Sequence, residues 1–248
     1  MVKIKAAVCH EFGAPLKIEM IDLREPITGE LEVTLGAVAV CHSDISFADG
    51  DWGGELPAVY GHEAAGFVSK IGNTVKGFEI GDRVVVTLIK SCGNCNNCLE
   101  GNPTICEANN TAMPPVLSSK GNTIQQVMNC GAFAEKVVVD QSQVVKLNYD
   151  LNFETASLLA CGVITGIGAV VNAAKLRPGQ DAVVIGAGGV GLNAIQGARI
   201  AGARRIIAVD TNKDKLVVAR EFGATDCVLA TEKSPWRIAK SLIGGGAD

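Results

Sequence analysis

The stretch from residue 181 to residue 230 constrains the fold of this chain more than any other part of it. Its apolar runs "DAVVIGAG", "RRIIAVD" and "DCVLA" alternate with two helical patterns, "GVGLNAIQGARIAGA" and "TNKDKLVVAREFGA". Short strands that alternate with helices form βαβ units with a parallel sheet. A full doubly wound domain has two such halves. Because the chain stops soon after the third strand, we expect only the first half, over residues 154–248, of a longer parent protein.

A glycine-rich turn joins the first of these strands to the first helix. It fits G-x-G-x-x-G, a pattern that indicates dinucleotide binding when it follows a strand and opens a helix, as it does here. The backbone of such a turn can approach a pyrophosphate closely, and the helix N-terminus offers free N–H groups to it. The alternative is a glycine-rich turn without a nucleotide. The candidate cofactor-binding residues of the turn are Gly186, Gly188, Gly189 and Gly191.

An aspartate ends the second strand of this pattern. Asp210 follows Gly191 by about twenty residues, the position from which a carboxylate accepts a hydrogen bond from the adenosine ribose. A carboxylate there repels a 2′-phosphate, so the sequence favours NAD over NADP. Lys213 and Lys215 lie nearby and weaken this preference without reversing it. We count Lys215 among the candidate cofactor-binding residues.

The chain before residue 154 has a different pattern. Val- and Ile-rich runs such as "EVTLGAVAVC", "DRVVVTLI" and "EKVVVD" are separated by Gly, Asn and Asp, which predicts a β-rich domain over residues 1–153, a compact and partly open barrel. Residues 156–174 come close to the length of a membrane span. They contain three glycines and several polar side chains, so we predict a buried helix between the two domains instead.

Four cysteines occur close together in "SCGNCNNCLEGNPTIC", residues 91–106. The chain has nine cysteines, an odd number, and no recognisable signal peptide, so clustered cysteines indicate a metal sooner than disulfides. Four thiolates leave no ligand position open for a substrate, which predicts a structural zinc in a lobe of about residues 91–107. Backbone N–H groups of the turns at Gly93, Asn94 and Asn96 would offset its charge. An iron–sulfur cluster is the alternative. The predicted ligands are Cys92, Cys95, Cys98 and Cys106.

Three further candidate ligands are scattered along the chain. Cys41 lies in "VCHSD", His62 in "YGHEAAG" and Cys161 in "ACGVITG". Taken singly, a buried cysteine or a lone histidine is usually not a ligand. Together they form a Cys2His set, which suits a catalytic zinc because it leaves a fourth position open.

The motifs "CHSD", "GHEAAG", the four-cysteine segment, "CGVITG" and "GAGGVG" occur in the order found in the zinc-dependent medium-chain alcohol dehydrogenases. The chain resembles this family over essentially its whole length, and the Cys2His set is itself the one known from alcohol dehydrogenases. The resemblance implies an α/β plus β fold: a GroES-like catalytic domain followed by the first half of a Rossmann NAD-binding domain. It also implies that the active site lies in the cleft between them.

The resemblance also implies roles for individual residues. Asp44 would support His62, and Glu63 would lie beside the catalytic zinc, while Ser43 would pass on the substrate proton. Thr165 and Val190 would flank the nicotinamide. Many members have a histidine a few residues after the first zinc cysteine. Here Ser46 stands at that position, so the proton path would end in water or in another group, and His42 would join it, bind phosphate or have no role.

The expected function is hydride transfer between NAD and a primary, aryl or allylic alcohol, or the corresponding aldehyde, with two zinc ions per subunit. A glutathione- or other thiol-dependent formaldehyde dehydrogenase is the alternative. A zinc-free quinone reductase and a non-catalytic structural zinc module are further alternatives. Residues 109–133 are predicted to line or cover the substrate pocket, and Cys9, Cys130 and Cys227 to be small buried residues without a role.

Composition excludes some partners. The net charge of −4, the scattered basic residues and an aromatic content of 4% argue against nucleic-acid binding. We expect a cytoplasmic enzyme with a small-molecule substrate and no membrane partner, a homodimer or homotetramer in its full-length form. We also expect little or no turnover from the 248-residue piece alone.

Overall fold

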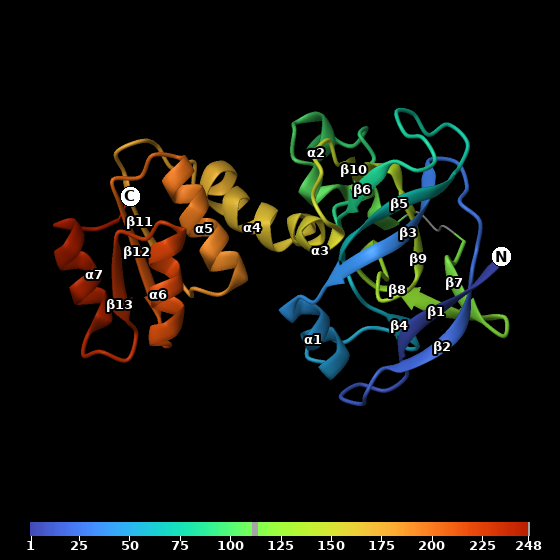
Figure 1. Ribbon diagram of the computed structural model, residues 1–248, viewed down its shortest axis with the longest axis horizontal. Helices are drawn as coiled ribbons and strands as arrows, with labels where there is room; N and C mark the ends of the chain where they lie inside the picture. Colours follow the sequence, from blue (N-terminus) through green and yellow to red (C-terminus); the bar gives the residue numbers. More distant parts are fainter. Residues whose placement is uncertain (111–113, 248) are drawn as a thin grey trace. The chain divides into compact units, whose positions relative to one another are not determined.

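The computed structural model describes residues 1–110 and 114–247 (Figure 1). The backbone divides into two compact units, Met1–Cys161 and Gly162–Asp248. The division follows Cys161, a few residues after the boundary that the sequence suggests at 153/154.

A small closed barrel forms one part of the first unit. Its strands, in the order in which they pair, are β1 (Val2–Cys9), β2 (Lys17–Leu23), β7 (Leu117–Ser119), β8 (Asn122–Gln126) and β4 (Ala58–Val59). Alternate apolar side chains of these strands point inward, as expected for strands with one solvated face. The barrel core consists of buried Ile4, Val8, Ile21, Leu23, Leu117 and Ile124, with their neighbours.

A five-stranded antiparallel sheet forms the other part of this unit. In pairing order its described strands are β10 (Val144–Lys146), β6 (Arg83–Val86), β5 (Glu63–Ile71), β3 (Glu30–Ala39) and β9 (Lys136–Asp140). The register of β3 against β5 shifts at Glu32/Val33 and Leu35/Ala37, and such bulges bend a strand and increase its twist. A single bridge from Ala6 to Ala134 connects the sheet to the barrel. The closed barrel and the curled sheet together confirm the predicted GroES-like architecture.

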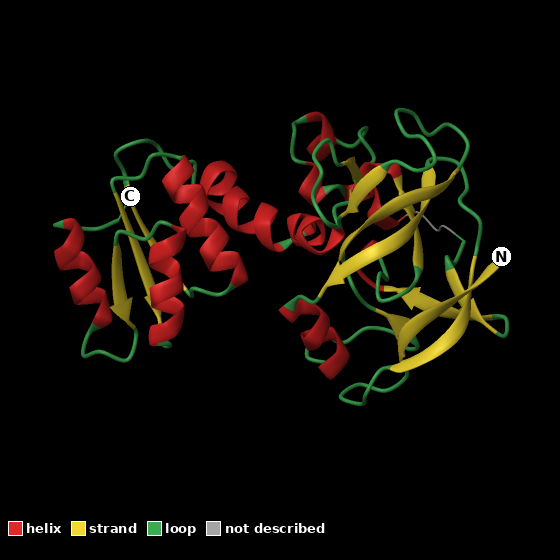
Figure 2. Ribbon diagram, in the orientation of Figure 1, coloured by secondary structure: helices red, strands yellow, loops and turns green. Residues whose placement is uncertain are grey.

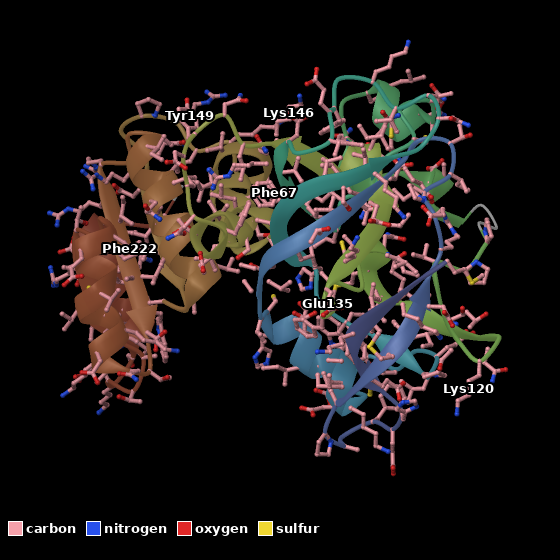
Figure 3. The ribbon with its side chains drawn as sticks, turned by 45° about the vertical axis from the view of Figure 1, so that its right-hand side comes forward. Phe67, Lys120, Glu135, Lys146, Tyr149 and Phe222 are labelled. Carbon is pink, nitrogen blue, oxygen red and sulfur yellow. The ribbon has the colours of Figure 1, made fainter. Side chains whose placement is uncertain are left out.

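Short helices fill the connections of the first unit. The described ones are α1 (His42–Asp49), α2 (Asn96–Leu99), η1 (Pro103–Ile105), η2 (Glu107–Asn110), η3 (Val127–Asn129), η4 (Gln141–Gln143), α3 (Phe153–Ser157) and η5 (Leu158–Ala160). α3 contacts β3 and β5. The ring of Phe67, which Figure 3 labels, packs edge-to-face on that of Phe153 at 4.8 Å between centroids.

The second unit has the βαβαβ order that the sequence predicts. Its elements are α4 (Gly162–Gly168), η6 (Ala169–Ala173), β11 (Asp181–Ile185), α5 (Gly189–Ile200), β12 (Arg205–Asp210), α6 (Lys213–Phe222), β13 (Asp226–Leu229) and α7 (Pro235–Ile243). The parallel sheet has the order β11-β12-β13. Helices lie on both sides of it (Figure 2): α5 and α6 pack on Ile206 and Ala208, and α7 packs on Ile207 and Val228. This confirms the first half of a Rossmann fold, and α7 is a helix that the sequence analysis missed.

The predicted single buried helix over residues 156–174 is wrong. The segment is broken at Cys161, whose φ of −143° and ψ of −69° are not helical, and it ends in the π-helical turn η6. It is also only partly buried, since Leu158, Ile164 and Val171 are between 41% and 49% exposed. Among the described residues no single helix is long and apolar enough to cross a membrane, and the segments Phe153–Ala160 and Gly162–Ala173 meet that requirement only as a bent pair.

Candidate active site and metal centres

In the described part of the chain, two groups of Cys, His and acidic side chains bring their ligand atoms within 4.8 Å of one another. The first group consists of Cys41, His62, Glu63 and Cys161. All four belong to the first unit, and His62 and Glu63 are buried. The structure therefore brings together the three scattered candidate ligands and the predicted neighbouring carboxylate.

The pairing of β3 with β5 explains why Cys41 and His62 meet. Ala39 at the end of β3 lies opposite Glu63 at the start of β5, so the residue before β5 and the residues after β3 occupy the same end of the sheet. Cys41 then caps α1, whose N-terminus begins there. The ladder thus fixes two ligands that are far apart in the sequence.

Asp44 is the buried centre of this arrangement. One carboxylate oxygen accepts the N–H of Gly61 at 2.9 Å and lies 3.0 Å from Nδ1 of His62, while the other accepts the N–H of Cys41 at 3.0 Å. Asp44 is only 2% exposed. The carboxylate fixes the imidazole by its Nδ1 side and leaves Nε2 for a metal, the usual arrangement of histidine ligands.

The titration of His62 reflects the same contacts. Burial alone lowers the pKa of the imidazole, but its hydrogen bonds and charge interactions with Asp44 and Cys161 outweigh burial and raise that pKa to about 10. A metal ion needs the neutral imidazole, so binding must displace a proton from this group.

Ser43 and Ser46 lie on α1 beside the cluster. The Cys41 thiol donates to the hydroxyl oxygen of Ser43 over 3.7 Å, so the candidate proton carrier touches a candidate ligand. Ser46 is buried one turn further along the helix, and His42 is exposed at its first residue. A hydroxyl rather than an imidazole therefore occupies position 46, three residues after Ser43.

The third candidate ligand is held by contacts that the sequence analysis missed. The hydroxyl of Thr87 donates to the carbonyl oxygen of Ala160 at 2.7 Å, directly before Cys161. Ala160 also packs on Ala65 and Val85. The predicted β-run "DRVVVTLI" contains Thr87, and this was the available signal for it. In the structure Thr87 directly follows β6, which pairs with β5 and so runs beside Glu63 and His62.

The second group consists of Cys92, Cys95, Cys98 and Cys106. The Sγ atoms of Cys95 and Cys106 lie 3.9 Å apart, which matches the separation of about 3.8 Å that Zn–S bonds of about 2.3 Å give in a tetrahedron. Backbone N–H groups of Cys92, Asn94 and Cys95 donate to sulfur at 3.3 Å each. Backbone hydrogen bonds at Cys98 and Glu107 lower the pKa of the Cys95 thiol to about 6, as expected for a group that binds a cation.

The glycine-rich turn of the second unit has two kinds of glycine. Gly186 has a φ of +94°, and a Cβ on Gly191 would lie 1.7 Å from the carbonyl oxygen of Gly186, so both are required by the turn itself. A Cβ on Gly188 or Gly189 would meet no atom within 4 Å. Those two positions leave open space above the N-terminus of α5, where a phosphate could approach.

Asp210 and the nicotinamide candidates lie around this turn. The carboxylate of Asp210 accepts the N–H groups of Ala187 and Asn212 at 2.7 and 2.8 Å, which lower its pKa together with the charge of Lys215. It thus joins the end of β12 to the turn. Thr165 lies on α4 and Val190 on α5, and these two helices contact each other. They approach closely at Gly166, where a Cβ would lie 2.4 Å from the carbonyl oxygen of Val190, so only glycine fits there.

Comparisons with known proteins agree with this geometry. The model of the alcohol dehydrogenase GroES-like domain matches residues 28–149, and that of the zinc-binding dehydrogenase matches residues 189–248. The chain is 37% identical to alcohol dehydrogenase 6 of Peromyscus maniculatus, over 100% of the chain and 69% of that relative. The chain belongs to the zinc-dependent medium-chain alcohol dehydrogenases.

Two further relatives of this dehydrogenase have more specific names. The S-(hydroxymethyl)glutathione dehydrogenase of Synechocystis sp. is 42% identical, over 92% of the chain and 64% of the relative. The crystal structure of benzyl alcohol dehydrogenase from Acinetobacter calcoaceticus has a TM-score of 0.91 at 33% identity, covering 100% of the chain and 69% of that structure. The chain therefore spans about two thirds of the length of these relatives. Zn²⁺ is the metal of this family, NAD is its expected coenzyme, and the oxidoreduction of alcohols is its reaction.

Both donor sets of the dehydrogenase suit zinc. Sulfur and imidazole nitrogen are preferred zinc ligands, and the tetrahedral spacing of the sulfurs and the Nδ1 contact of His62 are independent of any comparison. The candidate catalytic group offers a carboxylate in addition to two thiols and an imidazole. Its donor set therefore differs from the all-sulfur group of the lobe.

Residues 109–133, which were predicted to line or cover the substrate pocket, do not all lie in one place in the dehydrogenase. Residues 111–113 lie outside the described part of the chain. Leu117 and Ile124 are buried in the barrel core, so they do not line a substrate pocket. Gln125, Gln126 and Val127 line a small cavity of about 190 Å³ together with Phe47 and Tyr60. Cys9 and Cys130 are buried, as predicted, and Cys227 is partly buried.

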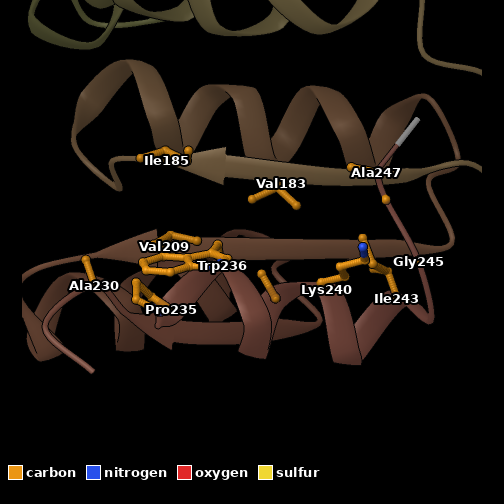
Figure 4. Close-up of a pocket in the computed structure, with 12 residues that line it drawn as sticks. Val183, Ile185, Val209, Ala230, Pro235, Trp236, Lys240, Ile243, Gly245 and Ala247 are labelled. Carbon is orange, nitrogen blue, oxygen red and sulfur yellow. The ribbon is translucent and has the colours of Figure 1, made fainter. Parts of the chain in front are cut away.

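A larger cavity of about 500 Å³ lies in the second unit, between the sheet and α7 (Figure 4). It is lined mainly by apolar side chains, among them Val183, Ile185, Val209, Trp236 and Ile243. None of the predicted site residues lines it. Cavity size alone therefore does not identify the site of this dehydrogenase.

Proposed function

We propose that the protein oxidises primary, aryl or allylic alcohols with NAD, or reduces the corresponding aldehydes, at Cys41, His62 and Cys161. The observation that carries this proposal is the meeting of these three side chains, with the imidazole held by the buried carboxylate of Asp44. The four thiols of the lobe, Cys92, Cys95, Cys98 and Cys106, would hold a second, structural zinc.

The chain's own residues have separate tasks in this proposal. Zinc, when bound, supplies the Lewis acidity that makes an alcohol hydroxyl more acidic, and NAD supplies the hydride acceptor. The Ser43 hydroxyl, in contact with Cys41, takes up the alcohol proton. Glu63 provides a carboxylate beside the ligands, available to exchange with water as a fourth donor.

Ser46 distinguishes the proton path of this chain. A neutral serine hydroxyl both donates and accepts a hydrogen bond, so it can hand a proton from Ser43 onward without keeping a charge. An imidazole at that position would itself change charge near neutral pH. The path is therefore proposed to continue from Ser46 to solvent, through hydroxyl groups of α1.

Residues of the second unit would bind the coenzyme. We assign the pyrophosphate to the turn of Gly186, Gly188, Gly189 and Gly191, and the adenosine ribose to Asp210 with Lys215 nearby. Thr165 and Val190 would flank the nicotinamide. The open space above Gly188 and Gly189 supports this assignment, because a phosphate needs close approach to the backbone.

A thiol-dependent formaldehyde dehydrogenase is a second candidate. It is supported by the 42% identity to an S-(hydroxymethyl)glutathione dehydrogenase, whereas an aryl alcohol substrate is supported by the similarity to a benzyl alcohol dehydrogenase. Assembly as a homodimer or homotetramer is proposed from the family resemblance. Localisation in the cytoplasm, and the absence of nucleic-acid and membrane partners, are proposed from the sequence composition and the cysteine pattern.

The first experiment measures zinc by mass spectrometry in the purified protein and in its Cys41→Ser and Cys95→Ser variants. We expect two zinc ions per chain and the loss of a different one in each variant. NADH formation by the longer parent protein, from benzyl alcohol and from S-(hydroxymethyl)glutathione, then compares the two substrate classes. A protein whose zinc content does not depend on Cys41 would contradict the proposed active site.

A further inference from the structure

We propose that Thr87 is the positioning residue of the third zinc ligand, Cys161. The proposal rests on the metal site described under Proposed function. The hydroxyl of Thr87 donates to the carbonyl oxygen of Ala160 at 2.7 Å. That carbonyl belongs to the peptide group that leads directly into Cys161.

The place of Thr87 in the sheet suits this task. It follows β6, in which Val86 pairs with Ala64 of β5. Continuation of this antiparallel register puts Thr87 beside Glu63, next in the chain to His62. Thr87 therefore lies beside the end of β5 that follows His62, and it also bonds to the segment that supplies Cys161.

The backbone of Cys161 departs from the helical conformation of the segments on either side of it. Cys161 lies between η5 and α4 with non-helical φ and ψ, and it is the last residue of the first unit. Ala160 packs on Ala65 and Val85, and apolar contacts of this kind are non-directional. They fix the depth of the segment, whereas a hydrogen bond to the carbonyl also fixes the direction of the peptide plane.

Thr87 is itself held firmly. Its backbone N–H donates to the carbonyl of Gln143 at 2.9 Å. Its own carbonyl accepts the side-chain amide of Gln143 at 3.0 Å and the thiol of Cys130 at 3.3 Å. Gln143 and Cys130 are each 1% exposed. A positioning residue is useful only where its own geometry is fixed, and this buried network fixes it.

The test compares Thr87→Val, which keeps the shape but removes the hydroxyl, with Thr87→Ser, which keeps the hydroxyl. Loss of a group that orients a ligand typically lowers metal affinity by about 10- to 100-fold. We expect Thr87→Val to weaken zinc binding at the Cys41 site by at least about tenfold on this basis, and Thr87→Ser to bind nearly as the wild type does. Zinc at the four-cysteine lobe should not change in either variant.

Two readouts that do not depend on turnover distinguish positioning from general destabilisation. One is zinc affinity by chelator competition. The other is the absorption of the Co²⁺-substituted protein, in which the thiolate-to-metal band lost in Cys41→Ser identifies the site. Thr225→Val is the control in the other unit, because it also removes a threonine hydroxyl that bonds to the backbone. That hydroxyl accepts the N–H of Ile206 at 3.0 Å, and it lies 2.7 Å from the carboxylate of Asp226 and 3.2 Å from the carbonyl oxygen of Ile206. We expect this control to leave both readouts unchanged.

The outcomes separate this inference from the proposed function. Wild-type affinity and an unchanged Co²⁺ spectrum in Thr87→Val would overturn the inference alone. A weakened site in Thr87→Ser would do the same, and it provides a test even where Thr87→Val does not fold. Absence of any Cys41-dependent metal in the wild type would overturn the proposed function and this inference with it.

Discussion

The two candidate metal sites of the protein obtain their ligands in opposite ways. The four sulfurs of the lobe come from one continuous segment, residues 92–106, and their backbone N–H donors come from the same segment. Cys41, His62 and Cys161 come from three segments, which a β-ladder, a buried carboxylate and a hydrogen bond to Ala160 bring together. The lobe can therefore form its site from local turns, whereas the catalytic site requires the folded sheet.

Removal of one ligand from each site tests this difference most strongly. We expect Cys41→Ser to lose one zinc ion and, in the longer parent protein, to lower turnover by more than about 100-fold, beyond the usual effect of outer-sphere changes. Cys95→Ser should lose the other zinc ion and keep Cys41-dependent metal. Zinc content and NADH formation measure both effects. Simultaneous loss of both ions in either variant would show that the two sites are not independent.

The buried ion pair between Arg24 and Glu30 allows the sheet to be weakened without touching a ligand. The guanidinium contacts both carboxylate oxygens, at 2.5 and 2.8 Å, and also donates to the carbonyl of Pro114. Glu30→Gln leaves a buried cation without its partner, which costs about 3 kcal/mol of the free energy of unfolding. In urea, this variant should lose the Cys41-dependent metal at lower denaturant than the lobe metal. Release of both metals together would contradict the local character of the lobe.

Acid should act on the same pair. Burial alone raises the pKa of Glu30, but hydrogen bonds from Arg24 and the Ile27 N–H, with the charges of Arg24 and Lys90, hold it below its ordinary value. A lowered folded-state pKa contributes stability above the unfolded-state pKa, and that stability is lost as the pH falls through the folded-state value. Between about pH 5 and pH 3, the wild type should therefore lose more unfolding free energy than Glu30→Gln. Equal losses in thermal unfolding would contradict this assignment.

Substitution of Asp44 should weaken zinc binding at the catalytic site but not at the lobe, with a smaller effect than removal of a ligand. Asp44→Asn keeps the size of the side chain but removes the charge and one of the acceptor oxygens that serve Cys41, Gly61 and His62. Zinc affinity at the catalytic site should fall by about 10- to 100-fold, with no change at the lobe. A variant with wild-type affinity would mean that the sheet alone orients His62.

The coenzyme turn is a third local site, and its expected change is the smallest. Asp210→Asn should weaken NAD binding by about tenfold, the equivalent of one charge-assisted hydrogen bond, and leave both zinc ions in place. Fluorescence titration with NADH measures the effect. The control is Asp226→Asn, which removes a carboxylate that pairs with Arg205 outside the turn. Equal weakening in both variants would contradict a specific contact at Asp210.

How much could be predicted from the sequence depends on how far apart the contacting residues lie. The lobe cysteines, the glycine-rich turn and Asp210 belong to short segments with fixed spacing, so their arrangement could be proposed directly. The resemblance of ordered motifs to a family indicated Asp44, Glu63 and Ser43. Neither route indicated Thr87 or Gln143, because their partners are segments far away in the chain and their residue types are common in strands and turns.

Sequence by itself determined the alternation of strands and helices in the second unit and the four-cysteine cluster, because hydrophobic period and ligand spacing are local properties. The candidate ligands Cys41, His62 and Cys161 were proposed from residue type and from the order of motifs, not from spacing. Only the tertiary structure decided how the helical segment breaks at Cys161 and which groups hold that residue. The reason is physical. The direction of one peptide plane depends on a hydrogen bond between Thr87 and Ala160, and no local pattern encodes a bond between residues that distant.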